Sequence, residues 1–189
     1  KINKENVKTL QKSGIEFVGP EYGYLSCGEI GIGRLSNEKK IIQIILNYLN
    51  KSKKLQNKKC LVTAGPTLEP IDPVRFISNY SSGKQGYEIA KQLMLSGAKV
   101  VLISGPTNLQ PPPNIKIIKV KTAKEMDKAV KNNLKSDVAI FTAAVSDFSP
   151  KKITNKKIKK ENLKNIIVKK NPDIIKNASI NKNNKPKYI

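Results

Sequence analysis

The sequence contains no histidine among its 189 residues. Histidine is the usual general base and a frequent metal ligand, so its absence excludes Ser-His-Asp and Cys-His catalysis within this chain and disfavours most transition-metal sites. The two cysteines, Cys27 and Cys60, lie in different segments and form no CxxC pair. This spacing fits a reducing compartment better than a disulfide scaffold, and we expect a cytoplasmic protein.

Long hydrophobic runs are also missing. The longest, around 100–103, is far shorter than the roughly 20 residues that span a membrane. The first residues lack the apolar stretch and small-residue cleavage site of a secretory signal. We therefore expect neither a membrane segment nor secretion. An apolar content of 38% is ordinary for a folded protein and can supply one large core or two small ones.

Acidic residues are scarce: 36 basic and 14 acidic side chains give a formal net charge of +22. Such a charge favours nucleic acid in general, but the lysines are spread over nearly every segment. Aromatic residues make up only 5%, and no helix-turn-helix, RNP or zinc-finger pattern occurs, so we expect no specific nucleic-acid partner. Only Arg34 and Arg75 are arginines, which makes both candidates for gripping an oxyanion with the planar guanidinium.

The pattern predicts two domains, 1–57 and 58–189. The elements expected in the first domain are a helix over 4–13 ended by Gly14, a strand over 15–18, a glycine-rich flap over 19–35, a helix capped by Ser36 or Asn37, and a linker over 51–59.

The second domain alternates between strands and helices. Strands are expected over 60–64, 98–104, 115–120 and 138–143. Helices are expected over 87–96 and 123–134. This alternation is typical of parallel sheets with right-handed crossovers, so we predict an α/β fold with a Rossmann-like, doubly wound and mainly parallel sheet. A short helix capped at 171–173 follows. Residues 187–189 resemble a strand that is only beginning, so the sheet is expected to be incomplete at its C-terminus.

Three polar loops begin at the carboxyl ends of predicted strands, after Ala64, Ser104 and Ala143. Ligands of open parallel sheets bind at this edge. The first loop offers backbone donors, hydroxyls and cations suited to phosphate and carboxylate, namely Gly65, Gly83, Gly86, Thr63, Thr67, Ser78, Ser81, Ser82, Arg75 and Lys84. It matches neither the Walker A nor the GxGxxG pattern, so neither a P-loop kinase nor a typical NAD enzyme is indicated.

Five motifs in register resemble the ligase half of the bifunctional phosphopantothenoylcysteine decarboxylase/phosphopantothenate–cysteine ligase family of coenzyme A biosynthesis: TAGPTLEPIDPVRFISNYSSGKQG, LISGP, FTAAVSDF, KIKK and KNPDI. Ahead of them, GPEYGYLSCGEIGIGRL resembles the substrate flap near the end of the FMN-binding decarboxylase half. The resemblance implies a ligase that joins 4′-phosphopantothenate to cysteine with CTP and Mg²⁺, through an acyl-cytidylate and with release of pyrophosphate.

The resemblance also implies roles for single residues. Asn79 matches the asparagine that polarises the acyl carbonyl, Lys157 the lysine that steadies the triphosphate, and Cys27 the proton donor of the decarboxylase. Only motif register distinguishes Lys157 from the neighbouring lysines. The residues expected to bind substrate or nucleotide are Gly65, Thr67, Arg75, Ser81, Ser82, Gly83, Gly105, Pro106, Ala143, Ala144 and Asp147. The metal ligands are not assigned.

Several points stay open. The FMN-side residues of such a decarboxylase would precede Lys1, so this chain is not expected to decarboxylate alone, and Cys60 is expected in the core. The complete protein is expected to be a homo-oligomer. The residues do not separate CTP from ATP. Two other functions are considered: a basic nucleotide- or RNA-binding module without catalysis, and a dinucleotide-dependent oxidoreductase.

Overall fold

The computed structural model describes residues 2–49, 52–159, 161, 165–181 and 185–189. The chain forms two compact units, Lys1–Lys51 and Ser52–Ile189. The backbone N–H groups of Ser52 and Leu55 donate to the carbonyls of Leu95 and Ser96, which ties this part of the connecting segment to the second unit. The predicted boundary after residue 57 lies a short way into the same segment.

The first unit contains two helices and a hairpin. They are α1 (Ile2–Lys12), β1 (Glu21–Tyr24), β2 (Ile30–Arg34) and α2 (Glu38–Leu49). The predicted flap forms the antiparallel β1–β2 hairpin. Asn37 caps α2, since its Oδ1 accepts a hydrogen bond from Lys39 N at 2.9 Å.

The strand predicted over 15–18 was wrong. This segment is irregular, and Ile15 and Phe17 are 49% and 41% exposed. An apolar run becomes a strand only where another strand can pair with it, and none of the described residues does so here.

The second unit is built on a four-stranded parallel sheet. Its strands are β3 (Lys59–Ala64), β6 (Lys99–Ser104), β7 (Lys116–Lys119) and β8 (Val138–Phe141), in the order β7-β6-β3-β8. Each pair of neighbours is parallel, so the predicted mainly parallel α/β sheet is confirmed. The five buried residues in succession along β3 are typical of a central strand that is covered on both faces.

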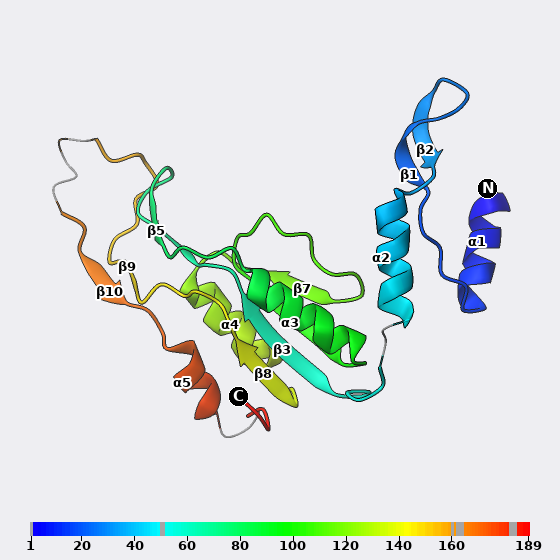
Figure 1. Ribbon diagram of the computed structural model, residues 1–189. Coiled ribbons are helices and arrows are strands. Elements are labelled where there is room, and N and C mark those ends of the chain that lie inside the picture. The colour runs from blue at the N-terminus through cyan, green and yellow to red at the C-terminus, as the bar shows by residue number, and fades with distance from the viewer. Residues whose placement is uncertain (1, 50–51, 160, 162–164, 182–184) are drawn as a thin grey trace. The chain divides into compact units, whose positions relative to one another are not determined.

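Helices cover both faces of this sheet (Figure 1). One face packs Val62 and Leu102 against α3 (Lys84–Leu95). The other packs Leu61 and Ile103 against α4 (Ala123–Asn133) and α5 (Ile174–Ser179). Alternate residues of β3 and β6 thus enter opposite core clusters, as the period of a strand requires.

Four short strands, missed by the sequence prediction, lie beyond the carboxyl edge of the sheet. They are β4 (Leu68–Pro70), β5 (Phe76–Ser78), β9 (Phe148–Pro150) and β10 (Val168–Lys170). β4 pairs with β5, β9 pairs with β10, and β4 contacts β9. We call these four strands and their connections the extension (Figure 1).

The chain reaches the sheet again near its last residues. Tyr188 forms a parallel bridge with Val138 of β8, and its carbonyl accepts a hydrogen bond from Ala139 N at 2.9 Å. This single bridge lies where the sequence predicted a beginning strand. No helix among the described residues has the length and apolar character needed to cross a membrane.

We expect Leu102→Ala to lower the free energy of unfolding by about 2–5 kcal/mol, because it removes a fully buried side chain and leaves a cavity between β6 and α3. Ile180→Ala is the matched control, since Ile180 is 65% exposed, and should change this free energy by no more than about 0.5 kcal/mol. Urea denaturation measures both. Equal losses in the two variants would contradict this assignment of the core.

Candidate functional site

The loop after β3 and the loop after β8 are joined by backbone hydrogen bonds. Ala144 N donates to the Gly65 carbonyl at 2.9 Å, and Thr67 N donates to the Ala144 carbonyl at 3.3 Å. On the other side of β3, Gly105 N donates to the Ala64 carbonyl at 2.9 Å. All three polar loops therefore meet at the carboxyl edge of β3, where the sequence analysis placed them.

Glycine allows the start of α3 to approach this edge closely. Gly83 and Gly65 both have a φ of 75°, in the left-handed region. A Cβ atom added to Gly83 would lie 3.2 Å from the Gly65 nitrogen. Any larger residue would push α3 away from the loop after β3.

A pocket of about 640 Å³ opens at the start of α3, and we call it the lysine pocket. Its lining residues are Ser81, Ser82, Lys84, Tyr87, Ser104, Gly105, Pro106, Thr107, Asn108, Leu109, Lys119 and Val120. They include two lysines and no carboxylate. The positive end of the α3 dipole lies here as well, so this pocket is suited to an anion.

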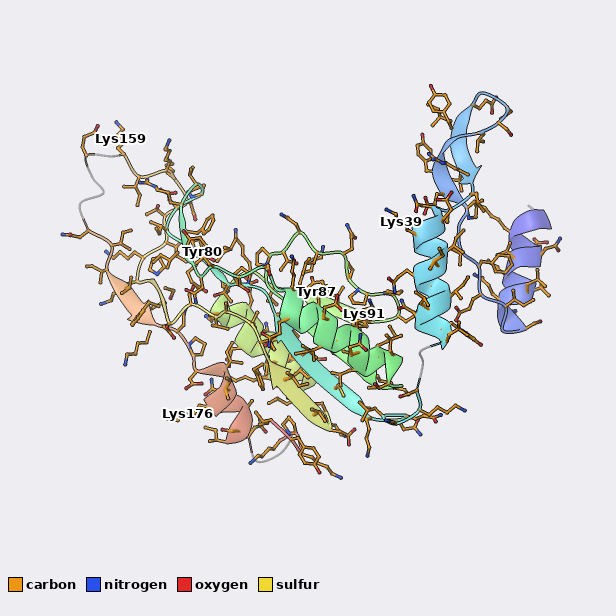
Figure 2. The ribbon with its side chains drawn as sticks, in the orientation of Figure 1. Lys39, Tyr80, Tyr87, Lys91, Lys159 and Lys176 are labelled. Carbon is orange, nitrogen blue, oxygen red and sulfur yellow. The ribbon has the colours of Figure 1, made fainter. Side chains whose placement is uncertain are left out.

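A chain of hydroxyl groups supports the floor of the lysine pocket. Thr107 Oγ1 donates to the Tyr87 hydroxyl at 3.2 Å, and that hydroxyl donates to Ser104 Oγ at 3.1 Å. Ser104 in turn donates to the Gly105 carbonyl at 2.7 Å. Tyr87, at the start of α3, is labelled in Figure 2. These bonds fix the loop after β6 to α3, and with it two of the residues predicted to bind ligand, Gly105 and Pro106.

A second pocket, of about 580 Å³, lies at the ends of β3 and β8, and we call it the Asp147 pocket. Its lining residues are Thr63, Met126, Phe141, Ala143, Val145, Ser146, Asp147, Phe148, Lys170, Asn171, Pro172, Asp173, Ile174 and Ile175. Most of the wall is apolar. Two carboxylates and one lysine supply its charge, so it differs in character from the lysine pocket.

Asn79 contacts a residue that lines the Asp147 pocket. Its side-chain Nδ2 donates to the carbonyl of Val145 at 3.0 Å, and Val145 lines the Asp147 pocket. Two residues further along the chain, Ser81 lines the lysine pocket and accepts a hydrogen bond from Gly83 N at 3.3 Å. The structure therefore brings Asn79 beside the small residues at the end of β8.

Thr67 is fully buried and links loops. Its Oγ1 accepts a hydrogen bond from Ser146 N at 3.0 Å, and its carbonyl accepts one from Ser78 Oγ at 2.8 Å. These bonds hold the segment from Ala144 to Asp147 in place. Direct contact between the Thr67 hydroxyl and a ligand stays a prediction.

The segment 171–173, part of the KNPDI motif, was missing from the predicted site. Asn171 Nδ2 donates to the Ser146 carbonyl at 2.8 Å, and Asn171 N donates to the Asp147 carbonyl at 2.8 Å. Asp173 caps α5, as predicted, by accepting from Lys176 N at 2.9 Å. The KNPDI motif was among those that carried the family resemblance, and this could have indicated that 171–173 line the pocket. In the sequence analysis these residues were explained as a helix cap, and no further role was sought.

Arg75 and Lys157 lie together at a third pocket, of about 470 Å³, lined by Val74, Arg75, Lys157, Ile158, Lys159 and Glu161. Arg75 Nη2 donates to Asp72 Oδ2 and to the Ile158 carbonyl, both at 2.6 Å. Asp72 Oδ2 also accepts from Ile158 N at 3.2 Å. The Asp72–Arg75 pair therefore holds the segment that carries Lys157. Lys159, which is labelled in Figure 2, lies two residues after Lys157 and lines the same pocket.

Asp72 is buried, and its side chain is fully covered. Burial by itself would raise its pKa, but hydrogen bonds from the Arg75 side chain and from the N–H groups of Val74, Arg75 and Ile158 hold the pKa well below its ordinary value. Contact between Arg75 and a substrate oxyanion stays a prediction, because the guanidinium already binds Asp72 and a carbonyl.

The two cysteines have different surroundings. Cys27 is exposed in the turn between β1 and β2. Cys60 is buried in β3, and burial raises the pKa of its thiol. Among the described residues, no three Asp, Glu or Cys side chains gather in a group that could hold a metal ion.

We expect Asp72→Asn to lower the melting temperature at neutral pH, because the amide cannot replace the charge that binds Arg75. The pKa of Asp72 is lower in the folded chain than its ordinary 3.8, so the carboxylate stabilises the fold above that value. The difference between wild type and variant should shrink as the pH falls below about 4. Melting curves from pH 7 to pH 3 measure it, and a constant difference would contradict this account.

Comparison with known proteins supports one family. The model of the DNA/pantothenate metabolism flavoprotein C-terminal domain matches residues 55–189. The coenzyme A biosynthesis bifunctional protein CoaBC of Borreliella burgdorferi is 48% identical over 184 residues, which are 96% of this chain and 47% of that protein. The chain thus spans about half the length of the curated relatives that it matches.

Two solved structures have the same architecture. The crystal structure of the C-terminal domain of CoaBC superposes with a TM-score of 0.63 at 42% identity, over 71% of this chain and 64% of that one. A mutant of Cab2 in complex with phosphopantothenate-cysteine superposes with a TM-score of 0.57 over 78% of this chain and 68% of that one; at 18% identity, it supports the fold alone. The family match over residues 55–189 shows that the chain belongs to the family of the DNA/pantothenate metabolism flavoprotein C-terminal domain.

Proposed function

We propose that Ser52–Ile189 is a ligase domain of coenzyme A biosynthesis that joins 4′-phosphopantothenate to cysteine at the expense of CTP. The observation that carries this proposal is the hydrogen bond from Asn79 to Val145 of the Asp147 pocket, on a segment whose next residues, Ser81 and Ser82, line a second pocket suited to an anion. A nucleotide-dependent ligase must hold a polyanionic substrate and a nucleoside at the same time. The names of the CoaBC relatives agree with this pathway.

The lysine pocket is suited to the phosphate of 4′-phosphopantothenate. Lys84 and Lys119 supply positive charge. The first N–H groups of α3 form the positive end of the helix dipole and add to it. The hydroxyls of Ser81 and Ser82 accept hydrogen bonds from Gly83 N and Lys84 N, and their O–H groups can at the same time donate to phosphate oxygens.

The Asp147 pocket is suited to the nucleoside of CTP. Its apolar residues can cover a flat base, and carboxylates accept hydrogen bonds from an exocyclic amine or from sugar hydroxyls. Mg²⁺ bound to a triphosphate takes oxygen ligands from phosphates, water and one or two carboxylates, and the exposed Asp147 carboxylate fits that type.

The chemistry then needs charge stabilisation more than proton transfer. A carboxylate oxygen of the substrate bonds to the α-phosphorus of CTP, and the bond to pyrophosphate breaks. The cysteine amine next bonds to the carbonyl carbon, CMP leaves with the electron pair, and the amine proton passes to water. Asn79 can donate to the acyl oxygen as negative charge develops there, while the Lys157 ammonium stabilises the pyrophosphate.

For Lys1–Lys51, we propose a part in a flavin-dependent decarboxylase that needs further residues of the protein. Among the described residues α2 buries none, and the hairpin exposes Tyr22, Tyr24, Ile30 and Ile32 by more than half. This unit alone does not enclose a flavin ring. In the full-length protein, Cys27→Ser should lower the yield of the protonated decarboxylation product while CO₂ release in a single turnover and ligation continue, because a proton donor acts after CO₂ has left. An unchanged yield of that product would contradict the role of Cys27.

We also propose that the full-length protein is a homo-oligomer that packs through the extension. Val74, Phe76, Ile153 and Ile167 are each more than half exposed there. Apolar side chains gathered on one small substructure are typical of a protein interface. Sedimentation equilibrium gives the number of copies, and a monomer would contradict this proposal.

We expect release of pyrophosphate from CTP in the full-length protein to require both 4′-phosphopantothenate and Mg²⁺. A coupled pyrophosphate assay with each component omitted in turn measures this, and parallel reactions with ATP test the choice of nucleotide. Salt-sensitive retention of RNA without pyrophosphate release would instead favour the basic binding module. Quenching or enhancement of NAD(P)H fluorescence would favour the oxidoreductase.

We expect Asn79→Asp and Lys157→Gln to block different half-reactions. The aspartate cannot donate to the acyl oxygen and repels its charge, so Asn79→Asp should accumulate acyl-cytidylate, with overall turnover lowered by about 10²- to 10³-fold. Lys157→Gln should prevent formation of the intermediate. Rapid quench with labelled CTP distinguishes the two.

Lys152→Gln is the matched control for these variants, since Lys152 is an exposed lysine of the same loop and lines none of the three pockets. It should keep both half-reactions. Equal loss of both half-reactions in Asn79→Asp and Lys157→Gln would reject this division of roles.

A further inference from the structure

Ser146 is a buried residue with one unsatisfied group. It is 2% exposed, and its Oγ has no hydrogen-bond partner among the residues that the structure describes. A buried polar atom without a partner destabilises the folded chain, and such atoms are rare in native proteins. Ser36, in the other unit, has the same property but lines none of the three pockets described above.

The backbone of Ser146 is fixed on both sides. Its N–H donates to Thr67 Oγ1 at 3.0 Å, and its carbonyl accepts from Asn171 Nδ2 at 2.8 Å. The main chain therefore cannot move easily to bring the hydroxyl to another acceptor. The Ser146 side chain can still rotate about its Cα–Cβ bond, which places Oγ in one of three staggered positions.

Neighbouring buried hydroxyls at the same edge of the sheet are satisfied. Thr63 Oγ1 accepts from Ala143 N at 3.3 Å, Thr67 Oγ1 accepts from Ser146 N, and Ser104 Oγ donates to the Gly105 carbonyl. The fold thus pairs these buried hydroxyls but leaves Ser146 unpaired. Ser146 also lines the Asp147 pocket, together with its neighbours Val145 and Asp147.

We propose that Ser146 is a binding residue that donates its hydroxyl to an oxygen of CTP in the Asp147 pocket. This inference rests on the proposed function, since it assumes that the pocket holds the nucleotide. Carboxylates in the pocket can only accept hydrogen bonds, whereas the phosphate and sugar oxygens of a nucleotide need donors. Thr63, Lys170 and Asn171 are other side-chain donors in the lining, and Ser146 adds a neutral donor that needs no change in its backbone.

The test compares wild type with Ser146→Ala in two measurements on the full-length protein. Without ligand, the melting temperature of Ser146→Ala should equal or exceed that of wild type, because the substitution removes an unpaired buried hydroxyl. With CTP and Mg²⁺, isothermal titration calorimetry should show affinity lowered by about tenfold, the loss that corresponds to roughly one hydrogen bond.

Ser149→Ala is the matched control, since Ser149 is also buried, lies in the adjacent β9 and does not line the pocket. It should bind CTP as wild type does. Unchanged affinity in Ser146→Ala beside clear binding by wild type would overturn the role of Ser146 alone. A lower melting temperature of free Ser146→Ala would also overturn it, because the hydroxyl would then have a structural partner. Failure of wild type to bind CTP would overturn the proposed function and this inference together.

Discussion

The pairing of β3 with β8 continues past the ends of both strands, and the candidate site depends on this continuation. Pro66 forms a parallel bridge with Ala144, and hydrogen bonds join Gly65 and Thr67 to the same residue. Backbone contacts therefore set where Val145, Ser146 and Asp147 lie. Because the sheet itself defines the positions of these loop residues, a ligand meets groups that are already in place, which lowers the cost of ordering them on binding.

The distribution of charge over the site differs from that of the whole chain. A net charge of +22 would attract any polyanion, but the Asp147 pocket has two carboxylates and one lysine in its lining. The lysine pocket has two lysines and no carboxylate. The lysine pocket therefore favours an anion, whereas the carboxylates of the Asp147 pocket can accept hydrogen bonds from a ligand, a local difference that the overall excess of lysine does not show.

Much of the second unit could be predicted because its signals are local. The apolar run of β3 and the helical period of α4 depend on residues near in sequence, and both elements were found within a residue or two of their observed ends. β9 could not be found in this way, because its three residues become a strand only by pairing with Val168–Lys170. The same limit applies to the site: Thr67 and Ser146 interact across 79 positions, a contact that no local pattern records.

Arg75 uses its planar guanidinium on a carboxylate of this chain. The scarcity of arginine marked it as a place where the planar fork matters, and the structure does use two of its nitrogens, Nε and Nη2, on Asp72 Oδ2. Nη2 also binds the Ile158 carbonyl, beside Lys157. A lysine here would keep the charge but could not maintain this planar set of contacts. The contacts of one guanidinium thus hold the main chain beside Lys157, the residue that we propose acts on the triphosphate.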